Sequence, residues 1–409
     1  MWLLEMNDTK EQLAAYSKTV DKELDALLSW WKTYAVDHAQ GGFYGEVTNR
    51  NKAIAEEPKG IVLNSRILWT FSAAYLLKAN KEDLAIARRA FEYLSTYFYD
   101  SLNGGFYWSL YPNGEVLDGK KQIYGQAFAI YGLSEYYKAS GDGKALEMAK
   151  ETFTLIEKHS FDPVHLGYIE AFDQAWGGLR DLRLSDKDLN VEKSMNTHLH
   201  IIEAYANLYC CWKDEHLQKA IKQLLFVFKT HIIIDDRLSL FFASNWHPQS
   251  TLISYGHDIE AAWLLQECAE SLGDLEEITL FKKIALAIAV AVQDGVDVDG
   301  GMYYEYDPVA GNTIREKHWW PQAEAMVGFF NAYQLSGDIS FLHKSIKSWA
   351  YITANLKDKE HGEWFWGRYP DGELMKENKA GFWKCPYHNG RACLEIIRRI
   401  NHSTILPQT

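Results

Sequence analysis

The chain has few cysteines and prolines for its length. Its five cysteines among 409 residues are an odd number without C-x-x-C spacing, which argues against a disulfide framework and a structural zinc site. Its nine prolines, with 47% hydrophobic and 24% charged residues, exclude a collagen-like or globally disordered chain. The composition predicts a globular protein with reduced thiols at Cys210, Cys211, Cys268, Cys385 and Cys393.

Positive charge and long apolar runs are also scarce. The 42 Lys and Arg residues are outnumbered by 55 Asp and Glu, and the net charge of −13 has the wrong sign for binding nucleic acid or anionic lipid. The most apolar stretch, residues 284–292, is about half as long as a membrane span. The first residues lack the basic and apolar regions of a signal peptide. We therefore expect a cytoplasmic protein with no nucleic-acid partner and no membrane segment.

Aromatic residues, in contrast, are abundant. They make up 14% of the chain, with 15 Trp and 24 Tyr. They could fill a large core, or they could form the walls of a carbohydrate pocket, where the C–H faces of a sugar stack on rings. Composition leaves both interpretations open.

A short phrase rich in glycine and aromatic residues recurs roughly every 62 residues. The wider gap between residues 167 and 301 contains a degenerate copy, so the chain holds six units. The copies are residues 41–46 (GGFYGE), 104–109 (GGFYWS), 167–172 (GYIEAF), 240–244 (LFFAS), 300–305 (GGMYYE) and 362–367 (GEWFWG).

Each phrase lies between two helical patterns, and turn signals such as residues 111–114 (YPNG) predict short hairpins there. The helices before the phrases carry charge on one face, as outer helices do; examples are residues 83–98, 145–159 and 217–231. The helices after them are apolar all round, as buried inner helices are. The expected inner helices span residues 61–77, 122–137, 193–211, 252–271, 319–335 and 386–400.

Six helix–hairpin–helix units could stack into an open solenoid or close into a ring. A solenoid needs polar caps at its ends, and neither terminus resembles one. We therefore predict an all-α fold, a closed (α/α)6 barrel with short β-hairpins at one mouth. No linker rich in Pro, Gly or Ser divides the chain, so residues 1–409 are expected to form one domain.

Polar side chains gather near the starts of the predicted inner helices, where burial without partners is costly. We place His200, His257 and His388 at equivalent positions in three repeats, a coincidence that packing alone does not explain. Helical spacing puts Asn196 and His200 on one face, whereas His198 points elsewhere. The other members of the set are Arg66, Tyr124, Glu203, Glu260, Trp320, Glu324 and Trp383.

Each of these residues also has a structural interpretation, as a hydrogen-bonded core histidine, a helix-dipole partner or a core tryptophan. Among functional interpretations, a zinc site could use the three histidines with Glu260 beside them, but no metal-ligand spacing supports it. A glycosidase could use Glu260 and Glu324 as its two carboxylates. Proton transfer next to a carbonyl would use histidines, whose ordinary pKa suits both taking and giving a proton.

Five longer motifs resemble the N-acylglucosamine 2-epimerase superfamily and, within it, its disaccharide branch, the cellobiose 2-epimerases. The resemblance runs from about residue 20 to residue 400 and independently implies an (α/α)6 barrel. Gln322 and Asn389 match the disaccharide branch rather than the N-acylglucosamine epimerases. The motifs are residues 64–71 (NSRILWTF), 194–200 (SMNTHLH), 254–261 (SYGHDIEA), 319–325 (WWPQAEA) and 382–391 (FWKCPYHNGR).

The resemblance implies an isomerase that inverts C2 of the reducing-end glucose of a β-1,4-linked disaccharide without a metal or other cofactor. His257 and His388 would be the acid/base pair acting through a cis-enediol, His200 their helper and Arg66 the stabiliser of the oxyanion. Glu260 would also orient His257. The expected substrate-binding residues are Tyr124, Asp188, Asn196, Glu260, Trp320, Glu324 and Trp383.

The resemblance leaves alternatives open. The same bases could serve a monosaccharide 2-epimerase or an aldose–ketose isomerase, and an (α/α)6 glycoside hydrolase or a carbohydrate-binding module would account for part of the pattern. The expected partner is a β-1,4-linked disaccharide such as cellobiose, lactose or mannobiose, and the expected state is a monomer.

Overall fold

The computed structural model describes residues 2–402. Within this range the chain forms twelve α-helices that alternate between an outer and an inner position. The outer helices are α1 (Trp2–Tyr34), α3 (Lys81–Tyr93), α5 (Gly143–His159), α7 (Glu215–Val227), α9 (Leu275–Ala291) and α11 (Ile339–Asn355). The inner helices are α2 (Ile61–Lys78), α4 (Ile123–Ser140), α6 (Met195–Cys211), α8 (Tyr255–Leu272), α10 (Trp319–Ser336) and α12 (Tyr387–Asn401).

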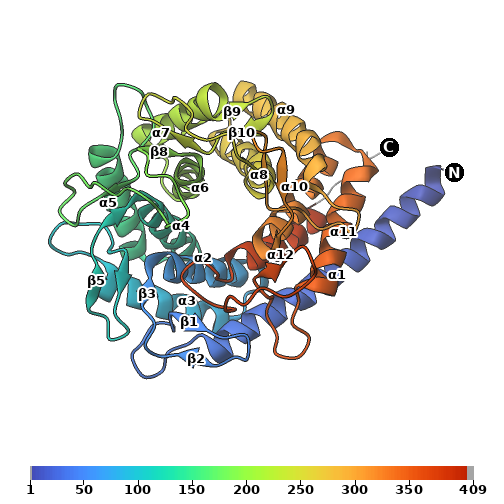
Figure 1. The fold of residues 1–409 in the computed structure, drawn as a ribbon. Helices are drawn as coiled ribbons and strands as arrows, with labels where there is room; N and C mark the ends of the chain where they lie inside the picture. Colours follow the sequence, from blue (N-terminus) through green and yellow to red (C-terminus); the bar gives the residue numbers. More distant parts are fainter. Residues whose placement is uncertain (1, 403–409) are drawn as a thin grey trace.

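The inner helices form a closed ring, which Figure 1 shows along its axis. Each inner helix packs against the next, and α12 packs against both α2 and α1. A bridge between Val47 and Ala380 joins the first and last units at the hairpin mouth as well. The predicted (α/α)6 barrel is therefore confirmed, and the open solenoid is not formed.

The burial of the helices follows their sequences. In α2 every residue from Ile61 to Ala74 is buried, whereas outer helix α3 buries only five residues on one face. Five outer helices begin after a tight turn with an Asn or Asp whose side chain accepts a hydrogen bond from a backbone N–H of the first turn, a favoured helix start. These caps are Asn80, Asp142, Asp214, Asp274 and Asp338.

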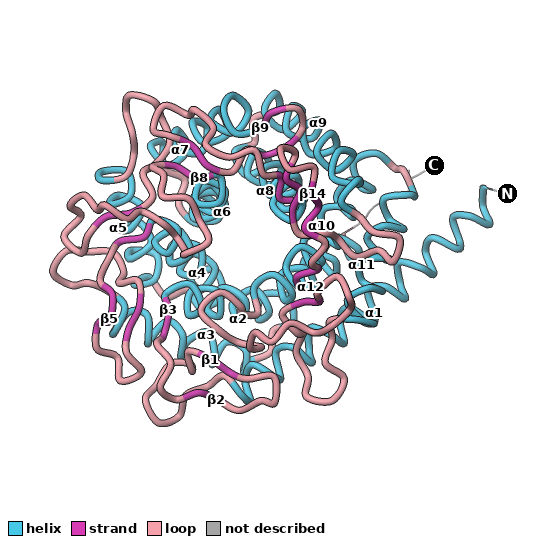
Figure 2. The backbone as a smooth tube through the Cα atoms, in the orientation of Figure 1, coloured by secondary structure: helices cyan, strands magenta, loops and turns pink. Residues whose placement is uncertain are grey.

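The outer helices begin at one mouth of the barrel, and the inner helices begin at the other. Short strands lie at the mouth where the inner helices begin (Figure 2). Some form hairpins within a unit, and others pair the strand before one inner helix with the phrase of the next unit. All pairs are antiparallel, so the strands tie neighbouring units together. Hairpin pairs are β1 (Glu46–Val47) with β2 (Ala53–Ile54), β4 (Ser109–Leu110) with β5 (Val116–Asp118), β9 (Ile233–Ile234) with β10 (Arg237–Leu238) and β13 (Glu305–Asp307) with β14 (Asn312–Ile314). Pairs between units are β3 (Lys59–Gly60) with β4, β6 (Lys121–Gln122) with β7 (Ala171–Phe172), β8 (Lys193–Ser194) with β11 (Phe241–Phe242), β12 (Ile253–Ser254) with β13, and β15 (Lys317–His318) with β16 (Gly367–Arg368).

A repeated ion pair lies on either side of the recurring phrase. In five units an Asp in the loop after the outer helix accepts a hydrogen bond from a Lys near the start of the inner helix, with both groups largely withdrawn from solvent. Buried charges persist only when they are paired and hydrogen-bonded. The pairs are Asp37–Lys59, Asp100–Lys121, Asp162–Lys193, Asp297–Lys317 and Asp358–Lys379, at 2.6–2.9 Å.

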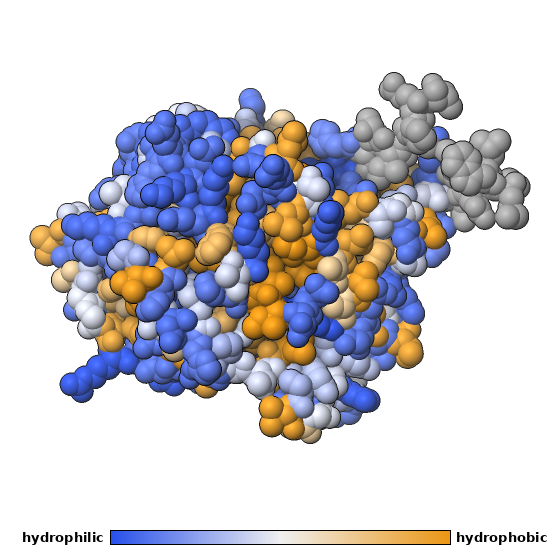
Figure 3. Space-filling model, turned by 90° about the horizontal axis from the view of Figure 1, so that it is seen from above, coloured by the Kyte–Doolittle hydropathy of each residue, from blue (hydrophilic) through white to orange (hydrophobic). Residues whose placement is uncertain are grey.

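The most apolar outer helix is α9, which contains the predicted apolar stretch. Leu275, Leu280 and Val290 on this helix are exposed, and Figure 3, seen from the side where α7 and α9 lie, shows apolar surface between hydrophilic regions. None of the helices in residues 2–402 has the length and apolar character needed to span a membrane.

Candidate active site

The candidate residues come together inside the mouth where the inner helices begin. The three histidines, however, do not occupy equivalent positions. His257 is the third residue of α8 and His388 the second of α12, whereas His200 is the sixth of α6, about one turn deeper. The expected equivalence was wrong for His200, because a repeat read from the sequence does not fix the depth of a side chain within the barrel.

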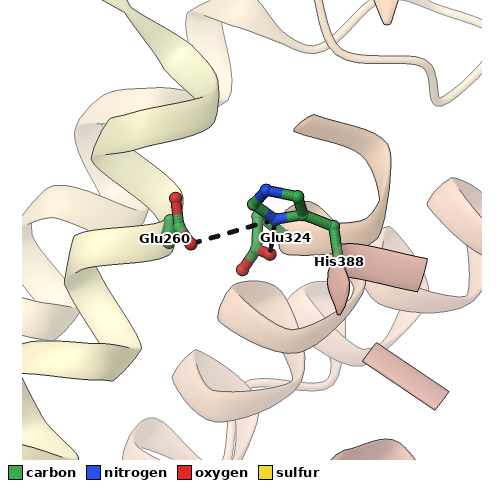
Figure 4. Close-up of side chains that lie close together, drawn as sticks. All are labelled: Glu260, Glu324 and His388. Carbon is green, nitrogen blue, oxygen red and sulfur yellow. Dashed lines mark hydrogen bonds and ion pairs between the residues drawn. The ribbon is translucent and has the colours of Figure 1, made fainter. Parts of the chain in front are cut away.

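His388 is held by a carboxylate. Its Nδ1 lies 2.7 Å from Glu324 Oε1 on α10. An ionised carboxylate can only accept, so the hydrogen is then on Nδ1 and Nε2 keeps its lone pair. Nε2 points away from Glu324 (Figure 4) and has no hydrogen-bond partner among residues 2–402. Burial, Arg66 and Arg391 hold the pKa of His388 well below its ordinary value.

His257 is held by a hydroxyl group instead. Its Nδ1 lies 2.8 Å from Ser254 Oγ, one turn earlier at the start of α8. The expectation that Glu260 orients His257 is therefore wrong, because Glu260 pairs with Arg391. Burial and nearby His200 lower the pKa of His257 to about 3.

The Trp320 indole contacts both of these histidines. Its ring centroid is 4.7 Å from that of His257 and 5.6 Å from that of His388. Trp320 is on α10, which lies between α8 with His257 and α12 with His388, so both imidazoles border the same part of the barrel interior.

His200 lies deeper and also has a carboxylate partner. Its Nδ1 is 2.9 Å from Glu203 Oε2, three residues further along α6. The ring packs against Phe128 and Tyr124 at centroid distances of 4.6 and 5.1 Å. Burial alone would raise the pKa of Glu203, but Arg391, His200 and Tyr387 lower it to about 2.

One guanidinium connects the carboxylates of three helices. Arg391 on α12 donates to Glu203, Glu260 and Glu324, and all four side chains are buried. Burial and Glu324 raise the pKa of Glu260 to about 7, against the opposing effect of Arg391. Arg391 was missed in the prediction. It lies three residues after His388 on a predicted inner helix, so the argument that a buried polar residue needs a partner applied to it as well.

These contacts bear on the glycosidase and metal interpretations. The nearest ligand atoms of Glu260, Glu324 and His388 lie within 4.8 Å of one another (Figure 4). The same Arg391 nitrogen donates to both carboxylates, so a glycosidic bond could not lie between them, as a glycosidase requires. The positive charge among these carboxylates is the guanidinium, which occupies the position that a cation ligated by them would need.

Arg66 and Tyr124 form a second polar pair. Arg66 Nη2 donates to Tyr124 Oη at 2.7 Å, and Nη1 donates to the Trp383 carbonyl at 3.3 Å. The guanidinium lies over the Phe128 ring, 4.1 Å from its centroid. Arg66 Nε is buried without a partner among the described residues. One donor of this fixed cation is thus unpaired within the described residues.

Asn196 lies one turn before His200 on α6, and Trp383 lies beside Tyr124. Asn196 is the second residue of α6, and its Oδ1 is buried without a partner in the described part of the chain. Trp383 precedes α12, and its ring centroid is 6.1 Å from that of Tyr124. A buried amide oxygen and a half-buried indole are groups that sugar hydroxyls and C–H faces can bind.

Asp188 lies apart, in the loop before β8. Ser185 donates to it through both N–H and Oγ, and burial raises its pKa. It also acts electrostatically on Glu305 of β13, whose pKa burial raises to about 7. Because β13 belongs to the fifth unit, this loop of the third unit comes close to the fifth, and Asp188 has no hydrogen bond to the three histidines among residues 2–402.

Gln322 and Asn389, the residues that matched the disaccharide branch, make structural contacts. Gln322 accepts from the Met302 N–H at 2.6 Å and donates to the Met302 carbonyl at 2.8 Å. Asn389 donates to Glu363. His198 likewise accepts from the Tyr168 N–H, so it points away from the site as predicted. These residues fasten the hairpins to the inner helices.

Known proteins are similar to this chain over most of its length. Residues 42–392 match the family model of N-acylglucosamine 2-epimerase (GlcNAc 2-epimerase). The chain is 47% identical over 382 residues to a cellobiose 2-epimerase of Bacteroides fragilis, covering 92% of this chain and 97% of that protein.

Two solved structures are similar over nearly the whole chain. Cellobiose 2-epimerase from Bacillus thermoamylovorans B4167 has a TM-score of 0.91 and 36% identity, covering 94% of this chain and 100% of that one. Cellobiose 2-epimerase from Spirochaeta thermophila DSM 6192 has a TM-score of 0.90 and 39% identity, covering 96% and 98%. The resemblance read from the five motifs is confirmed: the chain belongs to the N-acylglucosamine 2-epimerase family.

Proposed function

We propose that this protein is an isomerase that reversibly inverts C2 of the reducing-end glucose of β-1,4-linked disaccharides, converting cellobiose to 4-O-β-D-glucosyl-D-mannose. The whole-length similarity to proteins named cellobiose 2-epimerase supports both the reaction and the disaccharide substrate.

The observation that carries the proposal is the pair of anchored imidazoles. His257 and His388 are each fixed through Nδ1, while neither Nε2 has a partner among residues 2–402. Inversion at carbon needs one base to remove the C2 proton and another to protonate the opposite face. The two rings come from α8 and α12 and lie against Trp320 of the intervening helix α10, and this arrangement supports the assignment of two bases.

The remaining residues fit supporting roles. The free Arg66 donor would stabilise the negative charge that develops on the enediol oxygens, an effect that is large in a site with little water. His200, fixed by Glu203, would assist ring opening at O1. Tyr124, Asn196, Glu260 and Glu324 would bind sugar hydroxyls, Trp320 and Trp383 would stack on the rings, and Asp188 would contact the second sugar at the entrance.

The organisation of the protein is part of the same proposal. We treat residues 1–409 as one catalytic domain, because the contacts of α12 with α1 and α2 tie the ends of the described chain together. We also propose a cytoplasmic monomer, consistent with five unpaired cysteines. Light scattering of the purified protein tests the monomer.

The proposal is tested by incubating the protein with cellobiose and following the anomeric protons of the sugars by NMR. A new signal from a reducing-end mannose, with the glycosidic linkage intact, is the expected result. Release of free glucose would point to hydrolysis, and a ketose product would point to aldose–ketose isomerisation.

Matched incubations with mannose and with N-acetylglucosamine define the substrate class. Turnover of either monosaccharide with no change in cellobiose would contradict the disaccharide assignment while leaving the histidine chemistry in place.

A further inference from the structure

Three buried carboxylates converge on one arginine at the base of the site. Arg391 donates through Nη1 to Glu203 on α6 and through Nη2 to Glu260 on α8 and Glu324 on α10. Arg391, Glu260 and Glu324 are each 1% exposed and Glu203 is 4% exposed. Trp263 and the Tyr387 hydroxyl complete the cluster by donating to Glu324 and Glu203.

Two of these carboxylates are the partners of histidines. Glu203 faces Nδ1 of His200, and Glu324 faces Nδ1 of His388. A carboxylate opposite Nδ1 fixes the ring orientation and its tautomer, and it stabilises the imidazolium that forms when Nε2 takes a proton. This arrangement works only while the carboxylate is ionised.

We propose that Arg391 is a positioning residue for two histidines at once: its guanidinium keeps Glu203 and Glu324 ionised and in place, so that Glu203 orients His200 and Glu324 orients His388. This inference rests on the proposed function for its catalytic consequence, but the coupling of the two histidines through Arg391 is a property of the protein without substrate.

Electrostatics require such a cation. Three carboxylates withdrawn from water repel one another, and without a counter-charge they would take up protons. Arg391 helps to lower the pKa of Glu203 to about 2, and it opposes the rise that burial causes in the pKa of Glu260 and of Glu324. The charged and titratable groups that face this cluster from the packed helices are Arg66 on α2, Tyr124 and Tyr131 on α4, His200 and Glu203 on α6, Glu260, Glu267 and Cys268 on α8, Glu324 on α10, and Tyr387 and His388 on α12.

Removing the guanidinium raises the pKa of two kinds of group, the carboxylates and a histidine. The pKa of Glu203 and Glu324 rises, because the opposing positive charge is lost. The pKa of His388 also rises, because Arg391 holds it down. Since the proposed base must be neutral and its carboxylate ionised, both changes move the acid limb of kcat/KM to higher pH.

The first test compares the pH profiles of wild type, Arg391→Met and Arg391→Lys with cellobiose. Arg391→Met should lower kcat between roughly 10² and 10⁴-fold, as loss of a group that orients a catalytic histidine does, and should move the acid limb up by about one pH unit or more. Arg391→Lys should lie between wild type and Arg391→Met. Added guanidinium ion should partly restore Arg391→Met.

Lys59→Met is the matched control. Lys59 is 1% exposed and pairs with buried Asp37 at 2.8 Å, so its loss also removes a buried ion pair but touches none of the candidate residues. It should lower the unfolding temperature without moving the acid limb. An equal shift of the acid limb in Lys59→Met, or no shift in Arg391→Met, overturns the proposal.

A second test needs neither turnover nor an Arg391 variant. Imidazole 15N NMR of the wild-type protein should show His200 and His388 with the hydrogen on Nδ1. Because one guanidinium joins the two carboxylates, Glu203→Gln should change the signals of His388 as well as His200, and Glu324→Gln those of His200 as well as His388. If each variant changes only its own histidine, the proposal is overturned, whatever the protein does to cellobiose.

Discussion

At the scale of single residues, the two proposed bases differ in what holds them. His388 faces the carboxylate of Glu324, whereas His257 faces the hydroxyl of Ser254. A carboxylate stabilises the protonated ring much more than a hydroxyl does. A carboxylate can also only accept from Nδ1, whereas a hydroxyl can donate or accept, so the partner fixes the hydrogen position in His388 and leaves it open in His257.

Replacing either histidine by alanine should stop inversion while preserving the fold. Each change removes one of two required proton carriers, so epimerisation by His257→Ala or His388→Ala should fall by roughly 10²- to 10⁴-fold. Initial rates with cellobiose measure the effect, and circular dichroism checks the helices. Turnover near the wild-type rate would remove that residue from the acid/base pair.

Part of the site could be predicted from the sequence and part could not. Polar residues on apolar helices identified His200, His257, His388 and Arg66, since burial of such groups needs a reason. The carboxylate partner of His388 was not predictable. Helical spacing relates residues of one helix, whereas the Glu324–His388 contact joins two helices.

The same limit explains the wrong assignment of Glu260. It lies three residues after His257, a spacing at which side chains can meet. In the structure the Arg391 guanidinium takes Glu260, and Ser254 takes His257. Glu260 therefore pairs with a residue of another helix, and helical spacing could not predict that partner.

At the scale of elements, the Asp–Lys pairs hold each hairpin to the start of its inner helix. Asp100 shows the pattern: it accepts from the N–H groups of Leu102 and Asn103 and from Lys121 Nζ at 2.9 Å. Both Asp100 and Lys121 have fully buried side chains. The loop conformation and the entry of α4 are thus fixed by one ion pair.

Replacing Lys121 by methionine should destabilise the protein by about 3–5 kcal/mol, because it leaves the Asp100 carboxylate buried and unpaired. Chemical denaturation measures the change in the free energy of unfolding. Lys120→Met is the control: Lys120 is partly exposed and lies 3.7 Å from Asp118, so its loss should cost about 1 kcal/mol or less. Equal effects of the two variants would contradict the structural role of the pair.

The same pair should make stability depend on acid. Burial opposes ionisation of Asp100, but Lys121 and Asn103 outweigh it and lower its pKa to about 2. A carboxyl group whose pKa is lowered by folding stabilises the folded state at pH values above its unfolded-state pKa of about 4. This contribution is lost as the pH falls toward 2. Asp100→Asn should therefore flatten the decline of the unfolding temperature between about pH 4 and pH 2, as measured by scanning calorimetry. A decline as steep as that of wild type would exclude this role.

The elements themselves were largely predictable, because the phrase recurs and the helical patterns on either side of it differ in polarity. The inner helices begin within a few residues of their predicted starts; α10 begins at Trp319 as expected. The strands were predicted only as hairpins. Pairing between units, such as β6 with β7, depends on the ring and leaves no pattern in a strand of two residues.

At the scale of the whole molecule, ring closure places six helix starts around one mouth. Arg66 on α2 donates to the backbone of Trp383 just before α12, so the two ends of the repeat meet within the site. The predicted closure followed from the lack of polar end caps. The depth of each side chain within the ring could not be predicted from the sequence. The role of Arg391 and the deeper position of His200 became visible only in the structure.

Chelation should leave the activity of the whole protein unchanged. The cation between Glu260 and Glu324 is the Arg391 guanidinium, and the proposed proton transfers use no metal. Epimerisation of cellobiose before and after treatment with EDTA measures this. If EDTA abolished the activity and zinc or another divalent ion restored it, the metal interpretation would be supported.

The central claim, a two-base inversion at C2, is tested most directly by the origin of the C2 hydrogen in the product. Cellobiose is converted in D2O under single-turnover conditions, and NMR measures deuterium at C2 of the new mannose unit and of the remaining substrate. If His257 and His388 act on opposite faces, the product should carry deuterium at C2 and the remaining substrate should carry little. A product that keeps its original hydrogen at C2 would contradict the account.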